Sequence, residues 1–341
     1  MNLAELNKVA RAMTAPGKGL LAADESSGTI KRRFDAIGVE STEENRRDYR
    51  EMLFRATEAM SKSISGVILY DETIWQKAKD GTPLVELIKK AGSLPGIKVD
   101  EGTKPLPNCP GELVTIGLDK LADRLPKYHE QGARFAKWRA VIDIGPGIPS
   151  YACIRANVHA MARYAALCQT AQIVPIVEPE VLMDGGHDID RCAEVSEFVL
   201  KEQFQELYYQ RVALEGIVLK PNMVIAGKKS AKQASVEEVA EKTVKVLKAC
   251  VPGAVPGIAF LSGGQSDEDA TAHLDAINRL GPLPWSVTFS YGRALQAAPL
   301  KTWSGKPENV AAAQRAFAHR AAMNSLAARG QWKQDLEKKA A

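Results

Sequence analysis

The chain has 341 residues, of which 45% are hydrophobic and 25% are charged, as in an ordinary globular protein with a large core. Its formal net charge of +4 is too small and too dispersed to favour nucleic-acid binding, and no stretch is apolar enough to span a bilayer. Since the N-terminus carries no targeting pattern, we expect a cytoplasmic protein without nucleic-acid or membrane partners.

Neither the cysteines nor the histidines are spaced as metal ligands. The five cysteines include no C-x-x-C pair, and the five histidines include no H-x-H or H-E-x-x-H pattern. The cysteines are typical of reduced, buried small hydrophobes in a reducing compartment. We therefore expect no metal site and no cofactor.

Along the chain, residues 3–13 come first, with Leu3, Leu6, Ala10 and Met13 at helical spacing, which predicts an N-terminal helix. Eight short β-rich runs follow, at 19–24, 65–70, 96–100, 135–144, 173–181, 216–222, 257–263 and 285–292. Between and after them lie segments of helical period at 46–63, 150–170, 187–212, 236–251 and 309–329. In the segment 46–63, one continuous apolar stripe predicts one helix.

Eight strands alternating with helices predict an α/β fold, a single (β/α)8 TIM barrel, in preference to a doubly wound sheet. No interdomain linker is evident. We expect one domain over residues 1–341, with an N-terminal helical extension, a barrel core at 18–330 and a short C-terminal tail at 331–341.

Ionisable residues occur within the predicted strands, where a barrel places its core. The fourth strand carries Lys137 and Arg139, and the fifth carries Glu178 and Glu180, so each pair projects from one side of its strand. Trp138, between the first pair, is expected to pack outward. Further charged residues near the strand ends are Asp24, Lys98 and Lys220. A salt bridge explains any one of them, but so many together indicate a functional site, because buried charges are costly unless paired.

Lys220 is the best candidate for a nucleophile. It ends the sixth predicted strand, and the following Pro221 disfavours helical geometry at this position. A lysine crowded by apolar surface and other cations loses its proton more easily, which gives the neutral amine that attacks a ketone.

The seventh and eighth strands end in glycine-rich segments, FLSGGQS at 260–266 and FSYGRAL at 289–295. Barrels often bind phosphate in the loops after these two strands. A tight strand-to-helix turn explains either segment alone, but two at the appropriate strands favour a phosphate site.

The motifs together resemble class I fructose-1,6-bisphosphate aldolase over nearly the whole chain. The matching segments include LAADESSGTIKRRF at 21–34, FAKWR at 135–139, IVEPEVL at 176–182, LKPNMV at 219–224, FLSGGQS and FSYGRALQ. The resemblance implies reversible cleavage of fructose 1,6-bisphosphate to dihydroxyacetone phosphate and glyceraldehyde 3-phosphate, in glycolysis and gluconeogenesis, without a metal. It also implies a homotetramer.

The resemblance also implies roles for individual residues. Lys220 corresponds to the Schiff-base lysine and Glu178 to the main acid/base, with Asp24, Lys137 and Glu180 as supporting polar groups. The positions that hold the ketose 1-phosphate are Ser262, Gly263, Gly264, Ser290, Gly292 and Arg293. Those toward the 6-phosphate are Arg33, Ser26, Lys98 and Arg139, with Thr29 in place of the family's serine.

The C-terminal segment departs from the family pattern. Well-known animal members end in a tail with a terminal tyrosine, whereas QWKQDLEKKAA at 331–341 contains none. We therefore expect solvent, or a barrel residue such as Glu178, to protonate the enamine. Deletion of 331–341 is expected to change cleavage turnover only a few-fold.

Two alternatives remain open from the sequence. One is a related Schiff-base aldolase that prefers fructose 1-phosphate or sedoheptulose bisphosphate. The other is a barrel that senses phosphate or serves as a scaffold, which would not need both a strand-end lysine and an acid/base partner.

Overall fold

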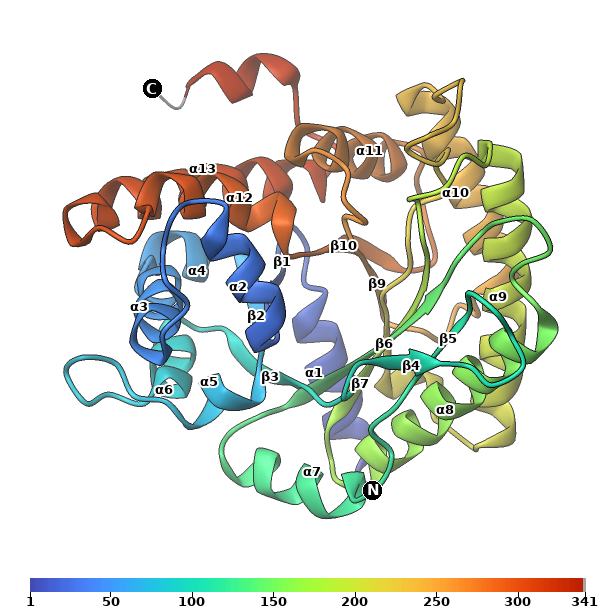
Figure 1. The fold of residues 1–341 in the computed structure, drawn as a ribbon, viewed down its shortest axis with the longest axis horizontal. Coiled ribbons are helices and arrows are strands. Elements are labelled where there is room, and N and C mark those ends of the chain that lie inside the picture. The colour runs from blue at the N-terminus through green and yellow to red at the C-terminus, as the bar shows by residue number, and fades with distance from the viewer. Residues whose placement is uncertain (340–341) are drawn as a thin grey trace.

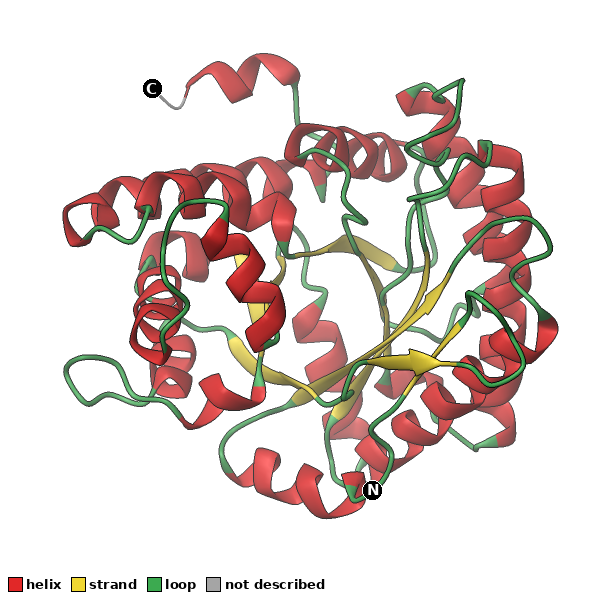
Figure 2. Ribbon diagram, in the orientation of Figure 1, coloured by secondary structure: helices red, strands yellow, loops and turns green. Residues whose placement is uncertain are grey.

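The computed structural model describes residues 1–339. Within these residues, eight parallel strands close into a barrel in the order β1, β10, β9, β8, β7, β6, β3, β2, surrounded by helices (Figures 1 and 2). The barrel strands are β1 (Gly19–Ala23), β2 (Ile64–Leu69), β3 (Leu94–Lys98), β6 (Phe135–Ile142), β7 (Val174–Val181), β8 (Val218–Leu219), β9 (Gly257–Phe260) and β10 (Ser286–Tyr291). The predicted (β/α)8 barrel is therefore confirmed.

Helices alternate with the strands. The α-helices are α1 (Leu3–Met13), α2 (Ser27–Asp35), α3 (Glu43–Phe54), α4 (Thr57–Ser63), α5 (Asp71–Trp75), α6 (Leu84–Lys90), α7 (Leu121–Glu130), α8 (Tyr151–Thr170), α9 (Ile189–Tyr209), α10 (Val236–Cys250), α11 (Asp267–Arg279), α12 (Arg293–Trp303) and α13 (Val310–Ala327). Three 3-10 turns are η1 (Leu214–Gly216), η2 (Pro307–Asn309) and η3 (Gln334–Lys339). No helix in the described part of the chain is long and apolar enough to cross a membrane.

The N-terminal helix α1 closes the end of the barrel where the strands begin. Its buried residues Leu6, Ala10 and Met13 pack in one cluster with Phe135 at the start of β6 and Val174 at the start of β7. An apolar plug at this end leaves the opposite end, where the strands finish, as the place for polar chemistry.

Strand β6 shows how one strand serves both the core and the interior. Trp138 faces outward, as expected, and its ring stacks on Tyr164 of α8 with centroids 5.5 Å apart. Because side chains alternate along a strand, its neighbours Lys137 and Arg139 point to the other face, into the barrel. On this one strand, Trp138 therefore packs against a surrounding helix, while Lys137 and Arg139 face the barrel interior.

The prediction of one helix over 46–63 was wrong, because two helices, α3 and α4, occupy this segment. The backbone leaves helical geometry at Ala56, where φ is −74° and ψ is 66°. The predicted apolar stripe is nevertheless buried in both helices, from Tyr49 to Met60. The helix breaks so that the second half turns and feeds β2 directly.

A two-stranded antiparallel hairpin, β4 (Thr103–Pro105) and β5 (Leu113–Thr115), lies between β3 and β6 and was not predicted. The hydroxyl of Thr115 donates to the carbonyl of Arg139 at 2.8 Å, which fixes the hairpin to β6. Gly102 and Thr103 line the cavity described below. The insertion therefore extends one wall of the barrel mouth.

Candidate active site

A cavity of about 670 Å³ opens at the carboxyl ends of the barrel strands. Every predicted site residue except Gly264 lines it, and Gly264 lies directly beside Arg293. The lining comes from the ends of β1, β3, β6, β7, β9 and β10, from the residue after β8, and from α2. The barrel thus brings together residues that are far apart in the chain, such as Asp24 and Arg293, which are 269 positions apart.

Four charged groups form the centre of the cavity, of which Lys137, Glu178 and Lys220 are buried and Asp24 is partly buried. Lys220 Nζ lies 3.1 Å from Glu178 Oε1, and Lys137 Nζ lies 3.4 Å from Glu178 Oε2 and 2.8 Å from Asp24 Oδ2. The Lys220 and Glu178 side chains are only 4% and 3% exposed. Two ammonium groups therefore alternate with two carboxylates, which lowers the large cost of burying each charge alone.

The electrostatics of this cluster fix the charge of its outer members. Burial opposes ionisation of Asp24, but the ammonium groups of Lys137 and Lys220 outweigh it and hold the Asp24 pKa well below its usual range. Burial also opposes the charge of Lys137, but Asp24 and Glu178 outweigh it and raise the Lys137 pKa. At neutral pH, Lys137 is a permanent cation and Asp24 a permanent anion, so neither exchanges protons readily.

Ion pairs surround this centre. Arg139 pairs with Glu180, and Lys98 Nζ lies 2.9 Å from Asp100 Oδ1. Asp100 also accepts hydrogen bonds from the backbone amides of Gly102 at 3.2 Å and Arg139 at 3.4 Å. Asp100 was not predicted as a site residue from the sequence, although it is the last residue of the third β-rich run, 96–100.

Arg33 of α2 approaches the cavity from the side of β1. It pairs with Glu25, whose carboxylate also accepts from Gln296 Nε2 at 2.9 Å. Glu25 is buried. Only the neighbouring carboxylate, Asp24, was predicted as a site residue from the sequence. Glu25 holds Arg33 in place through an ion pair. An anion that binds Arg33 would contact a guanidinium group that is already paired with this carboxylate.

The loops after β9 and β10 have the features of an anion site. Gly263 and Gly264 have positive φ values of 59° and 88°, a backbone conformation that favours glycine. Helix α12 begins at Arg293, so its first amides point toward the cavity end without helical partners. The hydroxyl oxygen of Ser290 is buried and has no hydrogen-bond partner among the described residues. These groups leave donors available for a phosphate.

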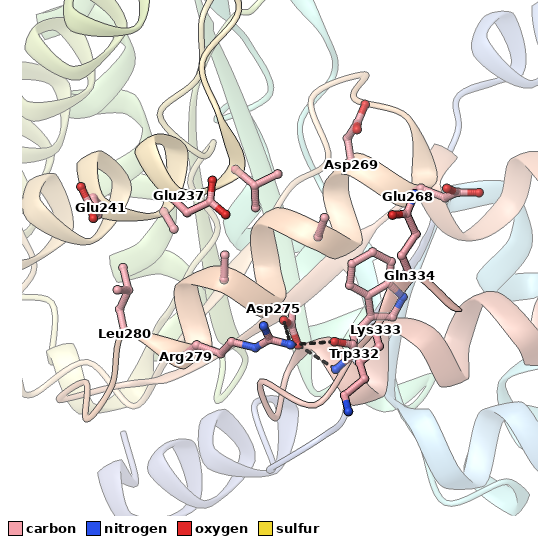
Figure 3. A pocket seen from close by; sticks show the side chains of 14 residues that line it. Glu237, Glu241, Glu268, Asp269, Asp275, Arg279, Leu280, Trp332, Lys333 and Gln334 are labelled. Atoms are coloured by element: carbon pink, nitrogen blue, oxygen red, sulfur yellow. Dashed lines mark hydrogen bonds and ion pairs between the residues drawn. The ribbon is translucent and has the colours of Figure 1, made fainter. Parts of the chain in front are cut away.

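The C-terminal segment packs away from this cavity. Asp275 of α11 accepts from the backbone amide of Trp332 at 2.7 Å (Figure 3). Trp332 Nε1 donates to Glu337 at 2.9 Å. Glu337 in turn pairs with the buried Arg320 of α13. No described residue of 331–339 lines the cavity, and Ala340 and Ala341 lie outside the described residues. The segment therefore contributes to packing on α11 and α13.

Deletion of 331–341 is expected to lower the free energy of unfolding by about 3 kcal/mol, because it strips the buried Arg320 of its closest carboxylate. Turnover per folded molecule is expected to change only a few-fold. Urea unfolding and steady-state cleavage, compared at matched folded content, measure the two effects separately. A collapse of proton exchange at C3 of dihydroxyacetone phosphate, with cleavage preserved, would instead assign the proton transfer to this segment.

Known proteins resemble this chain over nearly its full length. The family model for class I fructose-bisphosphate aldolase matches residues 5–341. A "Probable fructose-bisphosphate aldolase class 1" of Xanthomonas campestris is 58% identical over 98% of this chain and 100% of its own length. "Fructose-bisphosphate aldolase 1" of Toxoplasma gondii is 54% identical over 96% of this chain and 91% of its own length.

A solved structure shows the same arrangement in three dimensions. It is a fructose-bisphosphate aldolase from Plasmodium falciparum in complex with TRAP and a small-molecule inhibitor, 49% identical, with a TM-score of 0.96 over 97% of this chain and 96% of that chain. Because both the family model and the relatives extend over almost all residues that build the barrel and its cavity, this chain belongs to the class I fructose-bisphosphate aldolase family.

Proposed function

We propose that the reaction of this metal-independent family, reversible aldol cleavage of fructose 1,6-bisphosphate in glycolysis and gluconeogenesis, takes place in this chain through a Schiff base on Lys220. The observation that supports this best is the contact of 3.1 Å between the buried Lys220 Nζ and Glu178 Oε1. A nucleophilic amine and a proton-transfer group are thus already within hydrogen-bond reach.

In the first half of the reaction, Lys220 passes a proton to Glu178 and its neutral amine attacks the C2 ketone of the open-chain sugar. Glu178 returns a proton to the C2 hydroxyl of the carbinolamine, which leaves as water. The product is a protonated imine on Lys220. This cation acts as an electron sink, so that no metal is required to polarise the ketone.

In the second half, a carboxylate withdraws the C4 hydroxyl proton and the C3–C4 bond breaks. The electron pair of that bond moves to C3 and the imine, forming an enamine, and glyceraldehyde 3-phosphate leaves. Protonation at C3 restores the imine, and hydrolysis releases dihydroxyacetone phosphate and frees Lys220. Asp24 and Lys137 keep fixed charges beside the reacting atoms and so orient and stabilise them, with Glu180 supporting Arg139.

The two phosphates are assigned to two different sets of residues in and beside the cavity. We propose that the 1-phosphate binds between Ser262, Ser290 and the start of α12, with Gly263, Gly264, Gly292 and Arg293. The 6-phosphate is assigned to Arg33, with Ser26, Lys98 and Arg139. Bidentate guanidinium contacts suit phosphate oxygens at both ends.

Arg293→Ala is expected to lower kcat/KM for fructose 1,6-bisphosphate and fructose 1-phosphate alike, by roughly 10- to 100-fold, because a charge-assisted hydrogen bond is worth about 1.5 to 3 kcal/mol. Arg33→Ala is expected to impair the bisphosphate and largely spare fructose 1-phosphate. Steady-state kinetics with both sugars measure the difference. If Arg293→Ala lowers kcat/KM equally for an unphosphorylated ketose, Arg293 stabilises the fold and does not bind the phosphate.

The direct test of the proposed function is cleavage of fructose 1,6-bisphosphate by the purified chain, with and without EDTA. We expect the same turnover in both. Loss of turnover in EDTA with recovery on adding zinc would support a metal-dependent mechanism instead. Absence of cleavage in both buffers would contradict the proposed function.

We also propose a cytoplasmic homotetramer. A relative that is 55% identical over 94% of this chain is named "Fructose-bisphosphate aldolase 6, cytosolic", of Arabidopsis thaliana. Four exposed aromatic residues, Tyr151, Phe198, Tyr208 and Tyr209, lie on the neighbouring helices α8 and α9. Exposed aromatic surface of this kind is typical of subunit interfaces.

A further inference from the structure

A second cation, Lys228, approaches Gly264 together with Arg293; Arg293 lines the cavity, and Lys228 lies outside its lining. A Cβ atom built on Gly264 would lie 2.7 Å from Arg293 Nη2 and 2.7 Å from Lys228 Nζ. The two cationic side chains therefore approach the same glycine, whose backbone has a φ of 88°. Any other residue at 264 would displace one or both of them.

The fold places Lys228 here through backbone contacts between two loops. The loop after β7 and the loop after β8 run side by side, with the amide of Lys228 donating to Met183 O at 2.7 Å and that of Gly227 donating to His187 O at 2.9 Å. A Cβ on Gly227 would lie 2.2 Å from Gly185 O, so this close approach requires glycine. The backbone at Lys228 is thus held by contacts with the loop after β7.

The present partner of Lys228 is weakly bound. Lys228 Nζ lies 2.9 Å from Asp184 Oδ1, and the two side chains are 39% and 65% exposed. Ion pairs between such exposed groups contribute little, because water and salt screen them. Arg293, in contrast, has no carboxylate within 4.0 Å among the described residues. An anion bound beside Gly264 would therefore gain two cations and displace only one exposed carboxylate.

The charge of the expected ligand makes the second cation useful. A phosphate monoester carries between one and two negative charges at neutral pH. Arg293 neutralises one of them, and the donors of Ser262, Ser290 and the start of α12 are uncharged. Lys228 is the cation that lies beside Arg293 at Gly264, and it can neutralise the remainder.

We propose that Lys228 is a further phosphate-binding residue, which leaves Asp184 and contacts the 1-phosphate together with Arg293. This inference rests on the proposed function. It makes Lys228 a determinant of affinity for 1-phosphorylated ketoses, with no part in bond cleavage itself. When no phosphate is bound, Lys228 stays paired with Asp184.

The test compares Lys228→Met with Lys229→Met, an exposed lysine in the same loop with no assigned role. Lys228→Met is expected to raise KM for fructose 1,6-bisphosphate and for fructose 1-phosphate about 5- to 20-fold, since a partly exposed charge-assisted contact is lost, with kcat nearly unchanged. Lys228→Arg should restore most of the affinity. Asp184→Asn should lower KM, because it removes the competing carboxylate.

Two outcomes separate this inference from the proposed function. If wild-type protein cleaves the sugar but Lys228→Met has the KM of Lys229→Met, the inference is overturned and the proposed function stands. If Lys228→Met lowers kcat without raising KM, the lysine acts on the fold or the chemistry and the inference is also overturned. A wild-type protein that cleaves nothing contradicts the proposed function itself. Thermal unfolding of each variant confirms that the proteins compared are folded.

Discussion

Lys220→Met is expected to abolish cleavage of fructose 1,6-bisphosphate, lowering kcat on the order of 10⁶-fold, the scale of loss when a covalent nucleophile is removed. Without the amine, no imine forms, and no other group in the cavity provides an equivalent electron sink. Steady-state cleavage with a sensitive assay for dihydroxyacetone phosphate measures the loss.

The structure predicts that this variant still folds. Glu178 keeps a cationic partner after the change, because Lys137 Nζ lies 3.4 Å from its other oxygen. The free energy of unfolding should therefore fall much less than activity does. A kcat within tenfold of the wild-type value in folded Lys220→Met would show that another lysine, Lys98 or Lys137, carries the chemistry.

Lys137→Met is expected to damage the fold as well as the reaction. The buried Lys137 contacts the carboxylates of Asp24 and Glu178, and its removal leaves Asp24 without its closest cation. Breaking a buried ion pair from one side typically lowers the free energy of unfolding by about 3 to 5 kcal/mol. Urea unfolding measures this change, with Lys31→Met as the control, since Lys31 makes only an exposed pair with Asp35.

The loss of stability in Lys137→Met should depend on pH, and it should be smaller at lower pH. In the wild-type protein the Asp24 pKa is depressed, so its contribution to stability is present above the pKa of the unfolded chain and is lost as pH falls through the folded value. In Lys137→Met, burial opposes the charge with less compensation, which raises the Asp24 pKa and favours the protonated form as pH falls. The stability gap between the two proteins should therefore narrow from pH 8 to pH 5. A gap that is constant with pH would contradict this account of the cluster.

The barrel and its central charges could be predicted because their signals are local. Alternation within a strand directs Lys137 and Arg139 to one face and Trp138 to the other, and the same rule applies to Glu178 and Glu180. Charged residues in otherwise apolar strands indicate that one end of the barrel interior is polar. The closed barrel then brings these strand ends together without further sequence information.

What the sequence did not reveal depends on contacts between distant loops. The β4–β5 hairpin consists of three-residue strands, too short for a periodic signal. The partnership of Lys228 with Gly264 and Arg293 exists only when three separate loops meet. The anchoring of Trp332 on Asp275 likewise joins residues 57 positions apart.

The break between α3 and α4 was missed for a different reason. The apolar stripe runs through Ala56 without interruption, and neither proline nor glycine marks the end of α3. The backbone turns there because the second helix has to lead into β2, a tertiary requirement that local propensity does not contain.

The most direct test of the central claim, that the Schiff base forms on Lys220, is borohydride reduction in the presence of dihydroxyacetone phosphate followed by peptide mass mapping. Only an imine is reduced to a stable adduct, so the labelled residue is the nucleophile. Lys137 and Lys98 line the same cavity and serve as internal comparisons. The account predicts a single adduct on Lys220 that is absent from Lys220→Met. An adduct on Lys137 or Lys98 in the wild-type protein, or one that persists in Lys220→Met, would contradict it.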